Sequence, residues 1–211
     1  MRLERNHRSN NLPICGSEAP MTDLFELIIS RASHGVLLNP APSAADLDKM
    51  IAAATSAPDH GRLKPWRFVV FEGAARERLG EMMAQSLRGR LKEADDAQAA
   101  SEARKPMRAP MIVMVIAVAR EAKKVPRIEQ ILSAGAAAEN LILAAHALGF
   151  GSMWRTGEFV YDPQVKQALG LGEGEDIAGL IYVGSVAALP KSASPKAKSI
   201  DHSQALTRWP A

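Results

Sequence analysis

The sequence contains a single cysteine, Cys15, and few aromatic residues. One thiol excludes an internal disulfide framework and is typical of a reducing compartment, so we expect a cytoplasmic protein. Aromatic residues make up 5% of the chain, and 26 Lys and Arg are nearly balanced by 23 Asp and Glu. Because no basic stretch is interleaved with aromatic residues, nucleic acid is not an expected partner.

Long hydrophobic runs are also absent. Arg2, Arg5 and Arg8 resemble the basic start of a signal peptide, but no apolar segment of about 7 residues follows them. The longest apolar run, 111–119, is too short to cross a bilayer, which needs about 20 residues in a helix. We therefore expect no membrane partner, and we interpret residues 1–20 as a disordered N-terminal extension.

The common catalytic motifs are missing as well. The sequence has no G-x-G-x-x-G after a predicted strand, no phosphate-binding P-loop, no H-E-x-x-H, no C-x-x-C and no G-x-S-x-G. Its five histidines, at positions 7, 34, 60, 146 and 202, lack the spacing of metal ligands. We therefore expect no metal site and no catalytic side chain of the hydrolase type.

What the sequence does contain is an alternation of helical and strand patterns typical of one α+β domain. A capping box at Ser43 and Asp46 starts one predicted helix, and Asp162-Pro163 starts a short one. The run 111–119, with five β-branched residues, predicts a central strand buried on both faces. The other predicted elements are helices over 22–31, 74–104 and 127–148 and strands over 67–71, 149–157 and 177–183.

Arg31 ends the apolar stripe of the first predicted helix, formed by Leu24, Leu27 and Ile28. A buried guanidinium needs an anion, and the following Ala32-Ser33-His34-Gly35 adds a hydroxyl and turn backbone beside it. The pattern indicates a site for a phosphate or ribityl group. The alternative is that Arg31 simply follows the preference of cations for helix C-termini.

The connection 56–66 is the most unusual stretch of the chain. Two prolines and a glycine restrict its backbone while it displays Asp59 and His60. Connections of this length often carry function, although a plain surface crossover would have the same composition. An acid/base pair of Asp59 and His60 is weakly indicated, because adjacent loop side chains usually point apart.

The predicted helix 127–148 is small and apolar on all sides from Ser133 onward. Its only strongly polar side chains there are Glu139, Asn140 and His146, of which we interpret His146 as a hydrogen-bonded core histidine. Such a helix belongs at a centre, against other helices or a second subunit.

Four segments in order resemble the short-chain FMN-dependent NAD(P)H nitroreductase family. They are Arg31-Ala-Ser33, Ala57-Pro-Asp-His60 with Lys64-Pro-Trp66, Val125-Pro-Arg127, and Gly151-Ser-Met-Trp-Arg-Thr-Gly157. The resemblance covers about 21–186. It implies an α+β fold with a central mixed sheet flanked by helices, formed by residues 21–190, in an intertwined homodimer. The tail 191–211 would belong to the same domain or lie on the partner subunit.

The resemblance also implies where FMN lies. Arg31, Ala32 and Ser33 would hold the phosphate and ribityl end, and Ser56 and His60 would reach the flavin bound mainly by the other subunit. The segment Trp154, Arg155 and Thr156 would run along the isoalloxazine. The pyridine nucleotide would be received by Ala144, Ala145, His146, Ala147, Leu148 and Gly149. The family usually has a second arginine where this chain has Ala32, and Lys196, Lys198 or Arg208 could replace that cation.

The activity implied is an FMN-dependent oxidoreductase that takes hydride from NAD(P)H and reduces nitroaromatic or quinone-type acceptors, which bind in turn at one flavin face. Such chemistry requires positioning rather than a side-chain acid, which agrees with the missing catalytic motifs. The alternatives are a non-enzymatic dimer that binds or senses flavin, and a related flavin dehydrogenase or dehalogenase.

Overall fold

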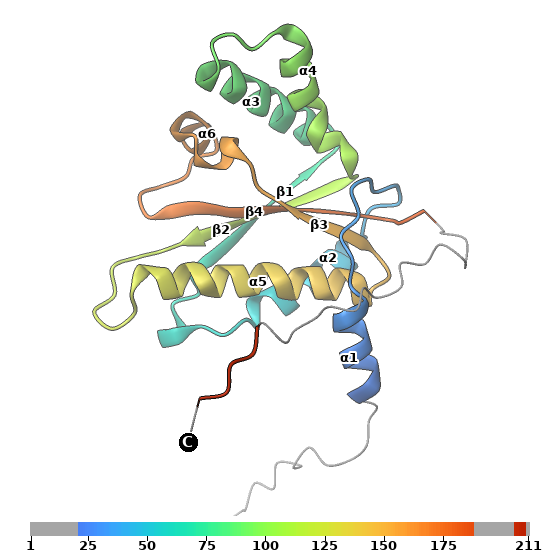
Figure 1. Cartoon of the computed structure of the whole chain (residues 1–211), viewed down its shortest axis with the longest axis vertical. Coiled ribbons are helices and arrows are strands. Elements are labelled where there is room, and N and C mark those ends of the chain that lie inside the picture. The colour runs from blue at the N-terminus through green and yellow to red at the C-terminus, as the bar shows by residue number, and fades with distance from the viewer. Residues whose placement is uncertain (1–20, 188–204, 210–211) are drawn as a thin grey trace, which may run out of the picture.

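The computed structural model describes residues 21–187 and 205–209 (Figure 1). The predicted extension 1–20 and most of the predicted tail lie outside the described residues, together with Cys15, Lys196 and Lys198. The helices are α1 Met21–Ser30, α2 Ala44–Thr55, α3 Ala74–Arg90, α4 Asp96–Arg104, α5 Arg127–Ala147 and α6 Pro163–Ala168. The strands are β1 Trp66–Glu72, β2 Met111–Val118, β3 Gly151–Arg155 and β4 Glu175–Gly184. No helix in these ranges is long and apolar enough to cross a membrane.

The four described strands form one sheet in the order β1-β2-β4-β3. All three pairings are antiparallel, and β2 lies at the centre with its first seven residues buried. The α+β class and the buried central strand are therefore confirmed. A mixed sheet was expected, but among the described residues the one parallel pairing is an isolated bridge between Ser33 and Ser152.

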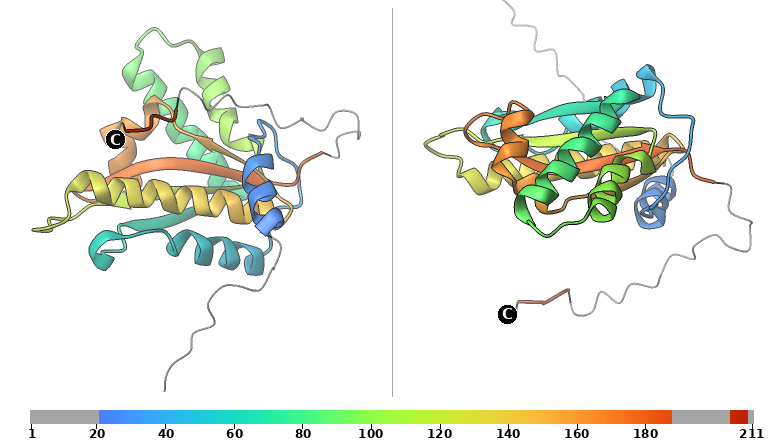
Figure 2. Two further views of the ribbon diagram at one scale, coloured as in Figure 1. Left: turned by 60° about the horizontal axis from the view of Figure 1, so that its bottom comes forward. Right: turned by 90° about the horizontal axis from the view of Figure 1, so that it is seen from above.

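Helices cover both faces of this sheet. Figure 1 and the left view of Figure 2 show α5 and α2 on one side and α3, α4 and α6 on the other. Alternate residues of β2 divide between the two layers: Val113 and Val115 pack with Met50 and Leu141, whereas Met114 and its even-numbered neighbours pack with the α3 layer. The division follows from the two-residue period of a strand.

One predicted helix is two helices in the structure. The sequence pattern indicated a continuous helix over 74–104, but α3 ends at Arg90 and α4 begins after Asp95, whose side chain caps it by accepting from the Gln98 N–H. The two helices pack closely, because a Cβ added at Gly80 would lie 2.1 Å from the Ala103 carbonyl oxygen. Tertiary packing of this kind overrides local helix propensity.

The predicted helix starts are confirmed at two places. Ser43 and Asp46 form the capping box of α2, and the Asp162 side chain caps α6 at Pro163. Helix α1 starts at Met21, one residue before the predicted cap Thr22. Its expected buried stripe is exposed in the single chain, with Leu24 at 65% and Ile28 at 46%.

Candidate functional site

The segment that follows α1 is attached to the edge of the sheet. Ser33 forms the parallel bridge with Ser152 of β3, and the His34 N–H donates to the Ser152 carbonyl at 3.0 Å. The bridge brings Arg31 and Ser33 beside β3, although more than a hundred residues separate them in the chain. Backbone pairing of this kind fixes the position of a polar segment without a helix or a strand of its own.

A cavity of about 180 Å³ opens between this segment, α5 and β3. It is lined by Arg31, Ser33, Glu139, Ile142, Ser152, Met153 and Trp154. The structure thus brings together three residues that the sequence predicted for one cofactor site, namely Arg31, Ser33 and Trp154. We call this group the Arg31 half-site.

Trp154 forms one wall of the Arg31 half-site and is held there by its neighbours on β4. Its indole N–H donates to the Ala178 carbonyl at 3.3 Å, and its ring lies directly over Gly179. A Cβ at position 179 would come within 2.0 Å of the indole nitrogen, so a side chain there would displace the ring. The glycine therefore sets the depth of the cavity.

The charges around the Arg31 half-site come from two helices. The Arg31 guanidinium lies 3.8 Å from Glu139 of α5, which is a long ion pair between partly exposed groups and adds little stability. Burial, followed by the charges of His146 and Arg31, lowers the pKa of His34 below its ordinary value. His34 is therefore held in its neutral form, which leaves Arg31 as the cation of the cavity.

The predicted nucleotide segment 144–149 lies at the C-terminal end of α5, beside α1. His146 is half-buried, and its Nε2 lies 3.2 Å from the Ser30 hydroxyl, so its expected hydrogen bond is present at the border between two helices. Ala145 is buried in the core, whereas Ala147 and Gly149 are exposed. None of the residues 144–149 lines the Arg31 half-site.

Arg155 and Thr156 are not brought together with Trp154 by their side chains. Successive residues of a strand point to opposite faces, and Arg155 lies over the Tyr182 ring at 5.7 Å from its centroid, on the α3 side of the sheet. Thr156 follows the end of β3 and is exposed. Beyond Trp154, this segment can therefore extend the Arg31 half-site only through its backbone atoms.

Ser56 and His60 occupy a separate loop that is braced from within. The Asp59 carboxylate accepts from the Leu63 and Lys64 N–H groups at 3.1 and 2.7 Å, and the Ser56 hydroxyl donates to the Ala53 carbonyl at 2.7 Å. We call this loop, residues 56–64, the His60 loop.

The side chain of His60 points to α5. Its Nδ1 lies 2.6 Å from a carboxylate oxygen of Glu129, so Asp59 and His60 have different partners and point apart, as predicted. Arg62 and Lys64 have φ values of 55° and 49°, and they are the two non-glycine residues with positive φ in the described chain. Backbone in this region costs about 1–3 kcal/mol per residue and concentrates at functional sites.

Helix α5 separates the His60 loop from the Arg31 half-site. Glu129 contacts His60 and Glu139 contacts Arg31, and these two carboxylates are ten residues apart on one helix. At a rise of about 1.5 Å per residue, roughly 15 Å of helix lies between them. One chain therefore does not bring all of the predicted cofactor residues into one cavity.

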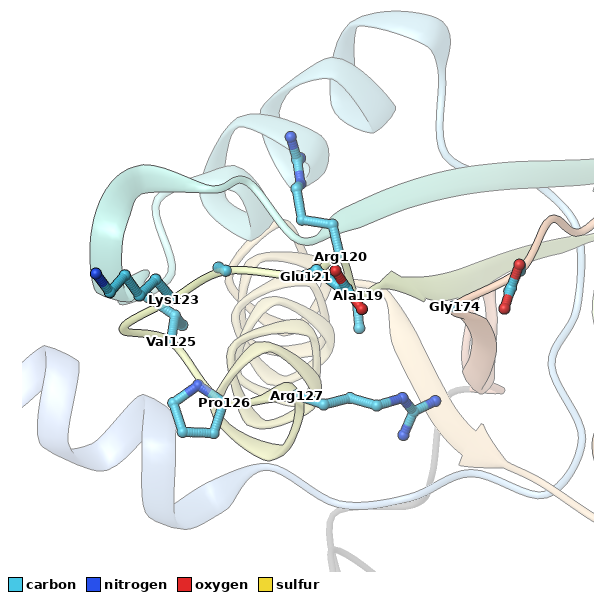
Figure 3. A pocket seen from close by; sticks show the side chains of 10 residues that line it. Ala119, Arg120, Glu121, Lys123, Val125, Pro126, Arg127 and Gly174 are labelled. Carbon is cyan, nitrogen blue, oxygen red and sulfur yellow. The ribbon is translucent and has the colours of Figure 1, made fainter.

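A larger open cavity, of about 1080 Å³, lies at the turn between β2 and α5 (Figure 3). It contains none of the predicted site residues. Figure 3 shows the side chains of Arg120, Lys123 and Arg127 pointing in different directions, and Arg127 is paired with Asp176 of β4. Cations that do not converge cannot share one anion, so we do not assign this cavity to the cofactor.

The sequence did not predict the two carboxylates that contact the site. Glu139 had a signal, as one of three strongly polar residues in an apolar stretch of helix, whereas Glu129 lies in a polar first turn and had none. Their partners are 108 and 69 residues away, beyond the range of any local pattern.

Exposed apolar side chains lie on α1, which precedes Arg31, and at the N-terminal end of α5, next to Glu129 and the His60 loop. Large apolar side chains on α1, and Ile128 and Leu132 on α5, are 45–65% exposed in the single chain; those of α1 are Leu24, Phe25, Ile28 and Ile29. Clusters of large exposed apolar side chains are characteristic of an interface.

Comparisons with known proteins agree with this architecture. YdjA, a provisionally named NAD(P)H nitroreductase of Escherichia coli K12, is 41% identical over 164 residues, which cover 77% of this chain and 88% of that protein. A provisionally named NAD(P)H nitroreductase of Haemophilus influenzae is 36% identical over 77% of this chain and 88% of that protein. The Bacillus cereus nitroreductase-like structure has a TM-score of 0.73 at 21% identity and covers 89% of this chain and 96% of its own.

A structure of a Bacteroides fragilis nitroreductase with bound FMN has a TM-score of 0.61 at 24% identity and covers 84% of this chain and 97% of its own. At these identities, the two solved structures show that the fold is shared. The nitroreductase family model matches residues 28–185, which include the Arg31 half-site, the His60 loop and all four strands. The chain belongs to the nitroreductase family.

Proposed function

We propose that the protein is an FMN-dependent oxidoreductase that takes hydride from NAD(P)H and passes reducing equivalents to nitroaromatic or quinone-type acceptors. The observation that carries this proposal is the cavity in which Arg31, Ser33 and Trp154 meet at the edge of β3. Family membership, the names of the relatives and the FMN of the Bacteroides fragilis structure support it.

The chemistry of the Arg31 half-site fits one end of FMN. A guanidinium and a hydroxyl are suitable donors for a phosphate or ribityl oxygen, and the half-exposed Trp154 offers a flat surface for a ring. Ala32 would contribute only backbone. The cavity of about 180 Å³ is smaller than the roughly 300–1,000 Å³ typical of ligand sites, so one chain provides only part of the site.

The rest of the site is contributed by a second copy of the chain. In the proposed homodimer the apolar surfaces of α1 and α5 are covered, and Ser56 and His60 of one subunit complete the Arg31 half-site of the other. This arrangement accounts for the roughly 15 Å of helix between the two groups on one chain. It also accounts for a braced, strained loop that has no cavity of its own.

FMN, when bound, supplies the ring that accepts and donates hydride. Arg31 and Ser33 anchor the ligand by charge and hydrogen bonds, and the backbone of Trp154, Arg155 and Thr156 runs along the ring. Segment 144–149, through its exposed residues, receives the pyridine nucleotide. Nucleotide and acceptor bind in turn at one open face, so positioning provides the catalysis. A cytoplasmic location stays a prediction from the single cysteine.

The test is an anaerobic addition of NADPH or NADH to the purified yellow protein. The proposal predicts that the visible flavin absorbance is bleached and that it returns when a nitroaromatic compound or a quinone is added. Flavin that keeps its colour with both nucleotides would indicate a binding or sensing protein instead. Light scattering of the same sample should give the mass of a dimer.

A further inference from the structure

Glu139 differs from the other strongly polar side chains in the apolar part of α5. Two of the three have hydrogen-bond partners: Asn140 donates to the Ala53 carbonyl at 3.1 Å, and His146 contacts a hydroxyl of α1 at 3.2 Å. Within the part of the chain that the structure describes, Glu139 has a single polar contact, the ion pair with Arg31. At 3.8 Å between Nε and the carboxylate oxygen, that pair is too long for a hydrogen bond. The Glu139 carboxylate is therefore free to accept hydrogen bonds from a ligand.

Glu139 and Arg31 are the two charged side chains that line the Arg31 half-site. Both reach solvent, because 48% of the Glu139 side chain and 31% of the Arg31 side chain are exposed. Solvent screening makes a loose pair of this kind weak, so either group can exchange it for a ligand at little cost. The cavity therefore presents a cation and an anion side by side to the molecule that binds in it.

The two side chains have opposite hydrogen-bonding roles. A guanidinium only donates, whereas a carboxylate only accepts. A bare phosphate at Arg31 would be repelled by Glu139, and an ammonium group at Glu139 would be repelled by Arg31. A ligand that suits both has an anionic end for Arg31 and neutral hydroxyl donors for Glu139. A phosphorylated polyol chain has this chemistry.

We propose that Glu139 binds the hydroxyl groups of the flavin ribityl chain while Arg31 binds the phosphate. This role rests on the proposed function, because it requires that the ligand of the half-site is FMN. It makes the cavity selective for the chain that joins the ring to the phosphate, which neither Trp154 nor Arg31 does. If Glu139 instead only competed with the phosphate for Arg31, removing its carboxylate would strengthen FMN binding rather than weaken it.

The experiment compares three flavins on the full-length protein from which bound flavin has been removed. Lumiflavin has a methyl group in place of the ribityl chain, riboflavin has the chain without the phosphate, and FMN has both. Quenching of flavin fluorescence gives the dissociation constants, so no catalytic activity is needed. Glu139→Gln, which keeps one acceptor oxygen, should weaken riboflavin and FMN binding about two- to tenfold. Glu139→Leu should weaken both at least about tenfold, and neither variant should change lumiflavin binding.

Matched controls are Glu81→Gln and Glu81→Leu, at an exposed position of α3, which should leave all three dissociation constants unchanged. Arg31→Ala is a second reference, because it should lower the preference for FMN over riboflavin and hardly affect riboflavin itself.

Three results with a wild-type protein that binds FMN would overturn the role of Glu139 but not the proposed cofactor. They are riboflavin binding that both Glu139 variants leave unchanged, an equal loss of lumiflavin binding, and stronger FMN binding. A wild-type protein that binds none of the three flavins would overturn the proposed function and this role together.

Discussion

The Arg31 half-site and the His60 loop both contact α5, but they differ in how firmly their residues are held. The half-site is a cavity whose walls come from three distant parts of the chain, and its contact with α5 is the loose pair of Arg31 and Glu139 at 3.8 Å. The loop has no cavity, yet it is fixed by two hydrogen bonds to Asp59 and by a contact of 2.6 Å between His60 and Glu129.

The difference shows which half is preformed and which is adaptable. The His60 loop has a strained backbone and satisfies its own hydrogen-bond donors. It can therefore bind to another surface with little further loss of conformational entropy. The Arg31 half-site has an exposed cation and lies next to a helix with exposed apolar side chains. These features suit the binding of a ligand and of a second protein surface. The two descriptions are complementary, and in the proposed homodimer the loop of one subunit would complete the cavity of the other.

The largest effect should come from removing the internal brace of the loop. Asp59→Ala deletes the carboxylate that accepts from Leu63 and Lys64, and hydrogen bonds to a charged group are worth about 1.5–3 kcal/mol each. We expect the free energy of unfolding in urea to fall by about 3 kcal/mol. Asp48→Ala, on the exposed side of α2, is the control and should change it by less than about 0.5 kcal/mol. Equal effects would mean that the loop is not braced by Asp59.

The next effect concerns the cavity. Arg31→Ala should weaken FMN binding by about 1.5–3 kcal/mol, or roughly ten- to 150-fold in the dissociation constant, because it removes a charge-assisted contact. The unfolding free energy should hardly change, in contrast to Asp59→Ala. The control is Arg78→Ala, an exposed arginine of α3. FMN titration by fluorescence measures both, and identical dissociation constants would count against the half-site.

The pair of His60 and Glu129 should have the smallest effect on stability. Both side chains are about half exposed, and exposed ion pairs contribute roughly 0–1 kcal/mol. We expect Glu129→Gln to change the unfolding free energy by no more than this amount while it lowers activity by loosening His60. A variant with full activity and reduced stability would show that the contact serves the fold alone.

Lowering the pH should affect the stability of the two halves of the site at different pH values. The folded pKa of His34, beside Arg31, lies below its ordinary value of 6.5, so the unfolded chain takes up this proton more readily. The contribution of His34 to stability is therefore complete above pH 6.5 and decreases as pH falls from there to the folded pKa. His34→Asn should flatten the pH dependence of urea unfolding in this window.

The helix that leads into the His60 loop should respond at lower pH. The Ser43 hydroxyl holds the pKa of Asp46 below its ordinary value of 3.8, so this contribution is present above that pH and is lost as pH falls through the folded pKa. His34→Asn should leave the lower window unchanged, and Ser43→Ala should leave the upper one unchanged. A single window altered by both variants would contradict this separation.

Local sequence signals predicted most of the elements and their starts. The capping box at Ser43, the cap at Asp162 and the apolar run after Met111 each depend on neighbouring residues, and each is confirmed. The break near Leu91 was not predicted, because 91–95 contains neither glycine nor proline. It depends on contact between α3 and α4 at Gly80, which is a tertiary effect.

The candidate site was predictable as a set of residues but not as an arrangement. Arg31, Ser33 and Trp154 meet as expected, whereas the period of β3 places the Arg155 side chain on the far face. The predicted strand already implied that Trp154 and Arg155 point to opposite faces, because side chains alternate along a strand. The contacts of Glu129 and Glu139 could not be predicted, because they depend on which face of α5 meets each loop.

The most direct test of the shared site is complementation between two inactive variants. Arg31→Ala and His60→Ala subunits, each with a different affinity tag, are co-expressed, and the heterodimers are purified through both tags. If each site takes Arg31 from one subunit and His60 from the other, a heterodimer has one doubly altered site and one intact site. It should then show about half of the wild-type NAD(P)H oxidation, well above either homodimer. If His60→Ala alone is mild, Asp59→Ala takes its place. Heterodimers no more active than the better of the two variant homodimers would contradict the account.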